Sequence, residues 1–171
     1  MKMKIAALVL IVLLPVLAVT ATYATKPAMG SGTATLTHRT MVGSSRPAGD
    51  NTIATFKETF DLTGTLTGTA VSLERDVTHA SSDKSFTTFQ GEANFTTPTG
   101  EAQSGKLVIH YVGINDGTTI HGQFVAGNGT GTFADFHGQG EFSGKVAMML
   151  VLNYTLQWHI DPAAVKTKHS A

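Results

Sequence analysis

Residues Gly127 to Phe142 read G-N-G-T-G-T-F-A-D-F-H-G-Q-G-E-F, and they are the most informative part of the chain. Glycine recurs along this stretch, and phenylalanine residues stand between the glycines. Glycine allows the backbone to bend sharply or to approach another strand closely, whereas buried phenylalanine stabilises the surrounding fold. The pattern predicts two short strands joined by a tight corner at the rim of a closed sheet.

On both sides of this stretch, apolar and polar residues alternate with the period of two that is typical of strands. No sustained helical pattern occurs outside the first residues of the chain. We expect a loop of turn-forming residues at 43–51 and an N-D-G hairpin turn that begins at Asn115. The other expected strands cover residues 33–42, 52–62, 65–77, 84–95, 105–113, 118–126 and 146–160.

This series of strands predicts an all-β fold, and we expect a single eight-stranded antiparallel β-barrel at residues 33–160. A β-sandwich is the alternative arrangement of as many strands. Glycines at strand ends and inside strands favour the barrel, because the strands of a barrel must bend at its corners. The interior of such a barrel is either filled by side chains or holds one small ligand.

The composition narrows the class of protein. The chain has 171 residues, no cysteine and a formal net charge of zero, which fits one globular domain. Because there is no basic surplus, we expect no nucleic acid partner. Because there is no cysteine, neither a disulfide nor a lipoprotein-type lipid anchor is available, and the core alone must stabilise the fold.

The first residues predict a secretory signal peptide at 1–24. Lys2 and Lys4 precede an apolar run, and small residues follow it up to Ala24. We expect cleavage after Ala24, with cleavage after Ala28 as the second choice. A retained membrane anchor is the alternative, but the run is shorter than the ~18–20 apolar residues of a spanning helix, and Pro15 interrupts it.

We therefore expect a secreted or periplasmic protein with no stable membrane span after signal removal. Residues 25–32 are expected to form an N-terminal tether, because glycine and proline recur there. Residues 161–171 are expected to form a flexible C-terminal tail.

The pattern G-x-G-T-G-x-F-x-x-F-x-G-x-G-x-F of residues 127–142 resembles the family of small bacterial proteins of unknown function described as allene oxide cyclase barrel-like. The turn at 64–68, Glu92 and the Tyr-Thr-Leu of residues 154–156 are similar to further features of that family. The central strand departs from it, since His110-Tyr111 stands where the family has Gln-His. The resemblance implies the barrel fold and no assigned reaction. Its wider relatives, plant allene oxide cyclases and dirigent proteins, fold a reactive small molecule inside the barrel without a cofactor.

Glu58 is the first residue whose place in the pattern needs an explanation. It shares one face of a predicted strand with Phe56 and Phe60. A bulge could turn it outward, or it could be a structural carboxylate with a partner. Alternatively, it is a polar group in the wall of a ligand cavity, where loss of hydration would raise its pKa.

Three more residues complete the candidate cavity site. Alternation with Ile109 lets Tyr111 bring a hydroxyl to an apolar wall, Glu92 could bring a carboxylate, and Trp158 an indole. A few polar groups in a mostly apolar pocket are typical of a small-ligand site. The alternatives are that these residues satisfy one another in a filled core, or that Glu92 faces water.

Other kinds of site lack a motif. The seven histidines show no metal-binding spacing, and there is no G-x-S-x-G elbow for a nucleophile. The glycines at 127–131 resemble a phosphate loop, but no G-K-[ST] follows them. We expect no metal and no other cofactor.

Three functions remain. The first is an exported barrel that binds a small apolar or aromatic ligand in its interior. The second is a cofactor-free isomerase or cyclase that acts on a small hydrophobic substrate, with Glu58 and Glu92 as acid or base. The third is a structural, self-associating module, a dimer or trimer, because Ala147, Met149 and Val151 would make the outer face of the last strand partly apolar.

Overall fold

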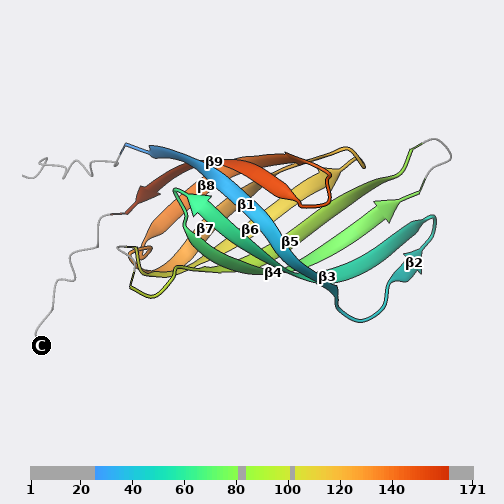
Figure 1. The fold of residues 1–171 in the computed structure, drawn as a ribbon, viewed down its shortest axis with the longest axis horizontal. Coiled ribbons are helices and arrows are strands. Elements are labelled where there is room, and N and C mark those ends of the chain that lie inside the picture. Colours follow the sequence, from blue (N-terminus) through green and yellow to red (C-terminus); the bar gives the residue numbers. More distant parts are fainter. Residues whose placement is uncertain (1–25, 81–83, 101–102, 162–171) are drawn as a thin grey trace, which may run out of the picture.

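The computed structural model describes residues 26–80, 84–100 and 103–161, and these residues form strands, turns and loops without a helix (Figure 1). The predicted signal peptide and the tail beyond Asp161 lie outside the described residues. In the described part, no helix is long and apolar enough to cross a membrane. The strands are β1 Ala28–Met41, β2 Arg46–Ala48, β3 Asn51–Gly64, β4 Gly68–His79, β5 Phe86–Thr96, β6 Gly105–Asn115, β7 Thr119–Gly131, β8 Phe136–Lys145 and β9 Val151–Ile160.

The strands form one closed antiparallel barrel. From β3 to β9 each strand pairs with the next along the chain, and β1 pairs with both β9 and β3. The barrel therefore consists of β1 and β3–β9, and the short β2 folds back on the start of β3 as an additional strand. The predicted eight-stranded antiparallel barrel is confirmed. Closure leaves its eight strands without a free edge, which accounts for the stability of a sheet with no covering helix.

The glycine-rich stretch folds as its pattern predicts. Strand β7 runs to Gly131, and β8 starts at Phe136 after a four-residue corner. Asp135 adopts a positive φ of 57°, a conformation that aspartate tolerates better than most residues, and Phe136 N donates to Phe133 O at 3.1 Å. Both phenylalanines are buried, so the corner is held by packing as well as by hydrogen bonds.

The predicted hairpin turn at Asn115 is also present. Gly117 has a φ of 86°, and the Asp116 carboxylate accepts hydrogen bonds from the backbone N–H groups of Thr118 and Thr119 at 2.9 and 2.7 Å. These bonds lower the pKa of Asp116. The turn residues thus fix the register between β6 and β7.

The main differences from the expectations concern three regions. Strand β1 begins at Ala28, so residues 28–32 are paired with β9 instead of forming a tether. Within the expected loop 43–51, Arg46–Ala48 forms β2. The expected last strand is shorter, because residues 146–150 form the β8–β9 connection, in which Val146 N donates to Thr118 O at 2.9 Å. An alternating pattern does not distinguish a strand from an apolar loop at the barrel rim.

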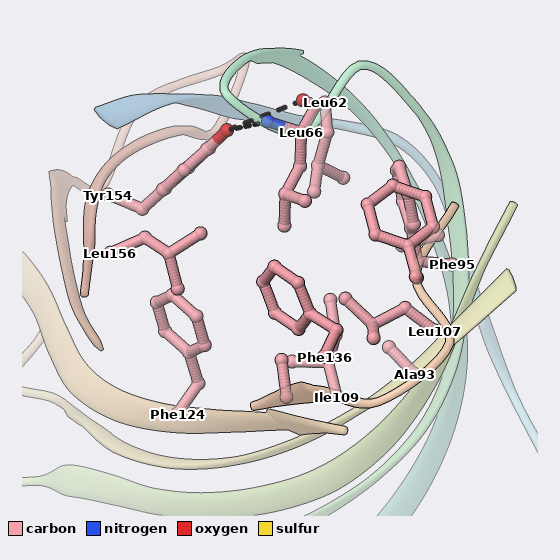
Figure 2. Close-up of a cluster of buried hydrophobic side chains, with 13 residues drawn as sticks. Leu62, Leu66, Ala93, Phe95, Leu107, Ile109, Phe124, Phe136, Tyr154 and Leu156 are labelled. Carbon is pink, nitrogen blue, oxygen red and sulfur yellow. Dashed lines mark hydrogen bonds between the residues drawn. The ribbon is translucent and has the colours of Figure 1, made fainter. Parts of the chain in front are cut away.

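One end of the barrel, the filled end, is packed with side chains. It carries the β3–β4, β5–β6 and β7–β8 connections, and its most deeply buried residues are Leu66, Phe95, Leu107, Phe133, Phe136 and Leu156. Figure 2 shows this core from within the ring of strands, with the side chains pointing toward its centre. The opposite end carries the β2–β3, β4–β5, β6–β7 and β8–β9 connections, and we call it the cavity end.

A tyrosine ties the filled end together. The Tyr154 hydroxyl accepts a hydrogen bond from Leu66 N at 2.9 Å (Figure 2). It also lies 3.0 Å from Thr63 O, to which it can donate. These bonds join β9 to the β3–β4 turn across 88 residues of sequence. They satisfy backbone groups that the buried turn would otherwise leave unpaired.

Candidate functional site

Between the filled core and the cavity end lies a cavity of about 120 Å³. Most of its wall is apolar, and it includes Leu150 from the β8–β9 connection and Asn115 from the end of β6. Phenylalanine rings from four strands contribute to it: Phe60, Phe89, Phe124 and Phe142. The interior of this barrel is therefore only partly filled by its own side chains.

One part of the wall is a charged cluster, which consists of Arg39, Glu58, Glu74 and Asp76. Arg39 Nε lies 3.2 Å from Glu58 Oε1, and Arg39 Nη2 lies 3.4 Å from Glu74 Oε1 and 2.7 Å from Asp76 Oδ2. The Glu58 and Glu74 side chains are 2% and 8% exposed, so both are removed from water. One guanidinium is thus shared by three carboxyl groups.

Two neighbours complete the cluster. The Arg39 guanidinium lies over the Phe56 ring, with 3.9 Å from Cζ to the ring centroid, which is a cation–π geometry. Ser72 Oγ donates to Glu58 Oε2 at 3.5 Å. In the described part of the chain, no group of three or more His, Cys, Asp or Glu side chains is arranged to hold a metal ion. The cluster is therefore built around the guanidinium.

Strand β4 supplies two of the carboxyl groups, because several of its polar side chains face the interior. Ser72 and Glu74 face the interior and are buried, and Asp76 follows on the same face. Leu73 lies on the other face and is 57% exposed. Because successive side chains of a strand alternate between its faces, the polar set of β4 points into the barrel and the apolar set points out.

A β-bulge in β1 supplies the arginine. Leu36 pairs with Phe60, but the next paired residue, His38, is opposite Thr59, so Thr37 is the extra residue. Its hydroxyl donates to Thr59 O at 3.1 Å. The extra residue exchanges the two faces of the strand, so that Arg39 is opposite Glu58 and reaches the interior.

Burial changes the proton affinity of the two glutamates. Desolvation, and then the charges of Glu58 and Asp76, raise the pKa of Glu74 from 4.5 to about 9. Desolvation also raises the pKa of Glu58, although the Arg39 guanidinium opposes the rise. At neutral pH the Glu74 carboxyl therefore retains its proton and can donate a hydrogen bond.

Tyr111 brings a hydroxyl to the same wall. Its oxygen lies over Gly91, where a Cβ atom would come within 2.4 Å of it, so only glycine leaves room for the ring. The oxygen is buried and forms no close hydrogen bond with a described residue, although weak hydrogen bonds with the Ser72 and Glu74 side chains act on its pKa. Asp76 Oδ1 is likewise buried without a close hydrogen bond. Burial, and then the charge of Glu74, raise the pKa of Tyr111, which keeps the phenol neutral.

The structure brings together two of the four candidate residues from the sequence. Glu58 and Tyr111 both line the cavity. Trp158 lies inside the barrel but stacks on Phe136 at the filled end, with 5.5 Å between ring centroids, and it is not part of the cavity wall.

The prediction that Glu92 lines the cavity is wrong. It is opposite His110 and on the outer face of β5, because the inward residues of that strand include Ala93 and Phe95. Its carboxylate lies 3.6 Å from His110 Nδ1, and both side chains are more than half exposed. His110 is accordingly a surface residue.

Three members of the cluster were not anticipated. Glu74 and Asp76 continue a run of alternate residues that starts at Ala70 and Ser72, and this period of two is a usable signal for a shared face. The sequence does not show which face is inward, since the large apolar residues Val71 and Leu73 of β4 are exposed. Arg39 carries no signal, because the bulge that turns it inward leaves no mark in the pattern.

Comparisons with known proteins give a fold and no activity. No protein-family model and no curated protein matches the chain. Among solved structures, the chain is similar to a protein with unknown function from the DUF3224 family of Shewanella oneidensis MR-1, with 14% sequence identity and a TM-score of 0.54. The similarity covers 81% of this chain and 100% of that one. At this identity the shared property is the barrel fold.

Proposed function

We propose that this chain is an exported β-barrel that binds one small apolar or aromatic molecule in its interior. The observation that carries the proposal is the cavity of about 120 Å³, with aromatic rings on several sides and a polar wall on one. Small-ligand sites combine such an apolar enclosure with a few polar groups that orient the ligand. The apolar rings supply affinity, and the hydroxyl of Tyr111 and the carboxyls of the cluster supply orientation.

The size of the cavity limits the ligand. An apolar cavity of ~150 Å³ in a protein interior can take up benzene. A cavity of about 120 Å³ therefore suits a molecule with a single ring or a short branched chain. Larger hydrophobic molecules would have to displace Leu150 or Asn115 at the cavity end.

Two features of the sequence support export and the use of the barrel interior. The predicted signal peptide supports export from the cytoplasm. The resemblance of residues 127–142 to allene oxide cyclase barrel-like proteins supports use of the barrel interior. Neither feature selects a ligand, and both are consistent with a barrel that works outside the cytoplasmic membrane.

The proposal is tested with toluene and phenol as probes, by thermal shift and native mass spectrometry. We expect a higher melting temperature and a one-to-one complex with at least one probe. Ala93 lies in the cavity wall, so Ala93→Leu should fill the space and remove the shift. Ala147→Leu, at an exposed position of the β8–β9 connection, is the matched control and should retain it. Equal shifts in both variants would place the probes outside the cavity and refute the proposal.

A cofactor-free isomerase is a second candidate, and the state of Glu74 favours it. A neutral carboxyl beside Glu58 at an apolar cavity is the arrangement of a general acid next to a base. Glu92 faces solvent, so the acid and base would be Glu74 and Glu58. The test is incorporation of solvent deuterium into cyclohexanone. We expect exchange that Glu58→Gln abolishes and Glu92→Gln does not, and exchange no faster than in buffer would eliminate this candidate.

A further inference from the structure

The charged cluster contains fewer cations than carboxyl groups. Arg39 contributes one positive charge, and Glu58, Glu74 and Asp76 are three carboxyl groups within ion-pair distance of it. The raised pKa values of Glu58 and Glu74 have the same origin, because buried carboxyls that share too few cations retain protons. A second positive charge at this wall would relieve the repulsion among the carboxyl groups.

Two buried polar atoms at the same wall lack a close hydrogen bond. Asp76 Oδ2 receives the short contact from Arg39, whereas Asp76 Oδ1 is buried without a close hydrogen bond from a described residue. The buried Tyr111 hydroxyl has only weak hydrogen bonds with the Ser72 and Glu74 side chains. A buried polar atom without a close hydrogen bond costs free energy. A ligand group with several N–H donors would give both atoms a close partner.

The rest of the wall suits a cation as well. Phe89 and Phe142 line the cavity together with Tyr111, with ring centroids 6.2 to 6.4 Å apart. The faces of aromatic rings attract cations, as the position of Arg39 over Phe56 already illustrates within this cluster. Rings and carboxyls at one cavity wall form a combination that recognises alkylammonium groups.

We propose that the ligand of this cavity is a small primary amine with one apolar ring, bound with its ammonium group between Asp76, Glu74 and Tyr111. This inference rests on the proposed binding function and specifies its ligand class. The ring occupies the apolar space between Phe89, Phe124 and Phe142. The ammonium group lies at the cavity end, where Asp76 is 13% exposed and Arg39 is 35% exposed, so part of its hydration is retained.

Other head groups fit less well. A carboxylate on the ligand would add a fourth acidic group next to Glu58, Glu74 and Asp76, and like charges at this distance repel. A hydroxyl could satisfy Tyr111 or Asp76 but would bring no charge. The order of affinity should therefore be amine, alcohol and then acid for molecules of the same shape.

The test compares benzylamine, benzyl alcohol and benzoate at neutral pH by isothermal titration calorimetry with the full mature chain. A charge-assisted hydrogen bond in place of a neutral one predicts that benzylamine binds about tenfold more tightly than benzyl alcohol, with benzoate weakest. If benzyl alcohol binds as tightly as benzylamine or more tightly, the amine inference is wrong while the binding function stands. If none of the three binds, both are wrong.

A test variant and a control variant together show where the ammonium group binds. Asp76→Asn should weaken benzylamine binding about tenfold and leave benzyl alcohol binding nearly unchanged, because only the charge is removed. Asp61→Asn is the control, since Asp61 lies on the outer face of β3, where it accepts a hydrogen bond from Thr69. Equal weakening of both ligands by Asp76→Asn, or an equal effect of Asp61→Asn, would contradict the placement.

Discussion

Glu74 shows how a single buried side chain sets both chemistry and stability at this site. Its carboxyl is neutral at neutral pH because burial and two neighbouring carboxyls raise its pKa to about 9. Tyr111 is adjacent, with a hydroxyl that has no close hydrogen bond among the described residues. At this scale the sequence predicted Glu58 and Tyr111, because a polar residue in an apolar alternation stands out, but it did not predict their partners.

The pKa of Glu74 predicts how stability depends on pH. In the unfolded chain this carboxyl has a pKa of 4.5, and in the folded chain it is about 9, so the folded protein binds the proton more tightly. The stabilising contribution is complete below pH 4.5 and is lost as the pH rises through 9. Urea unfolding at several pH values should give a falling free energy of unfolding over this window. Glu74→Gln should flatten the fall, and an unchanged slope would contradict the assignment.

The two interior tyrosines predict unequal results when the hydroxyl is removed. Tyr154→Phe leaves the buried Leu66 N–H without an acceptor, and we expect a loss of about 1–3 kcal/mol. Tyr111→Phe removes a hydroxyl that has only weak hydrogen bonds with Ser72 and Glu74, so it should change stability much less. Chemical denaturation of both variants measures the difference, and equal losses would show that the hydrogen bonds of Tyr154 contribute nothing specific.

Single strands carry the main differences between the pattern and the fold. The alternation of β3 predicted its inward face, including Glu58, because both phenylalanines beside it are apolar. The alternation of β4 gives the opposite impression, since Leu73 is exposed while Glu74 is buried. Only the pairing with β3 and β5 decides which face of β4 is inside, and pairing depends on residues far away in the sequence.

The bulge in β1 is the element on which the charged cluster depends. Thr37 is the extra residue of this bulge, and Arg39 follows it at the position opposite Glu58. Arg39→Met removes the cation and keeps the length of the strand. Because buried carboxyls would lose their cation, we expect a loss of about 3–5 kcal/mol in the free energy of unfolding. Arg75→Met, at an exposed position of β4, is the control and should cost far less. A mild effect of Arg39→Met would mean that Arg39 is not needed inside.

The molecule as a whole divides into a filled end that stabilises it and a cavity end that leaves room for a ligand. The sequence allowed a closed barrel of strands to be predicted. The signals were the glycines at strand ends and inside strands, and the absence of helical periodicity. The size of the cavity was not predictable, because it depends on how side chains from all the strands meet. Self-association into a dimer or trimer stays a prediction, now with Met148 and Met149 exposed in a loop instead of a strand.

This division predicts that stability and binding can be separated. Phe95 is fully buried at the filled end, so Phe95→Ala should cost about 3–5 kcal/mol. Phe86 is 37% exposed at the start of β5, and Phe86→Ala should cost much less. Both variants, studied at a temperature where they are folded, should bind toluene like the parent chain. Loss of toluene binding in the folded Phe95→Ala variant would show that the two ends are not independent.

The most direct measurement is a crystal structure of the protein soaked with toluene. The account predicts one ring inside the barrel, in contact with Phe89, Phe124 and Phe142, and close to the hydroxyl of Tyr111. An interior closed by the protein's own side chains, with toluene absent or bound only to the outer surface, would contradict it.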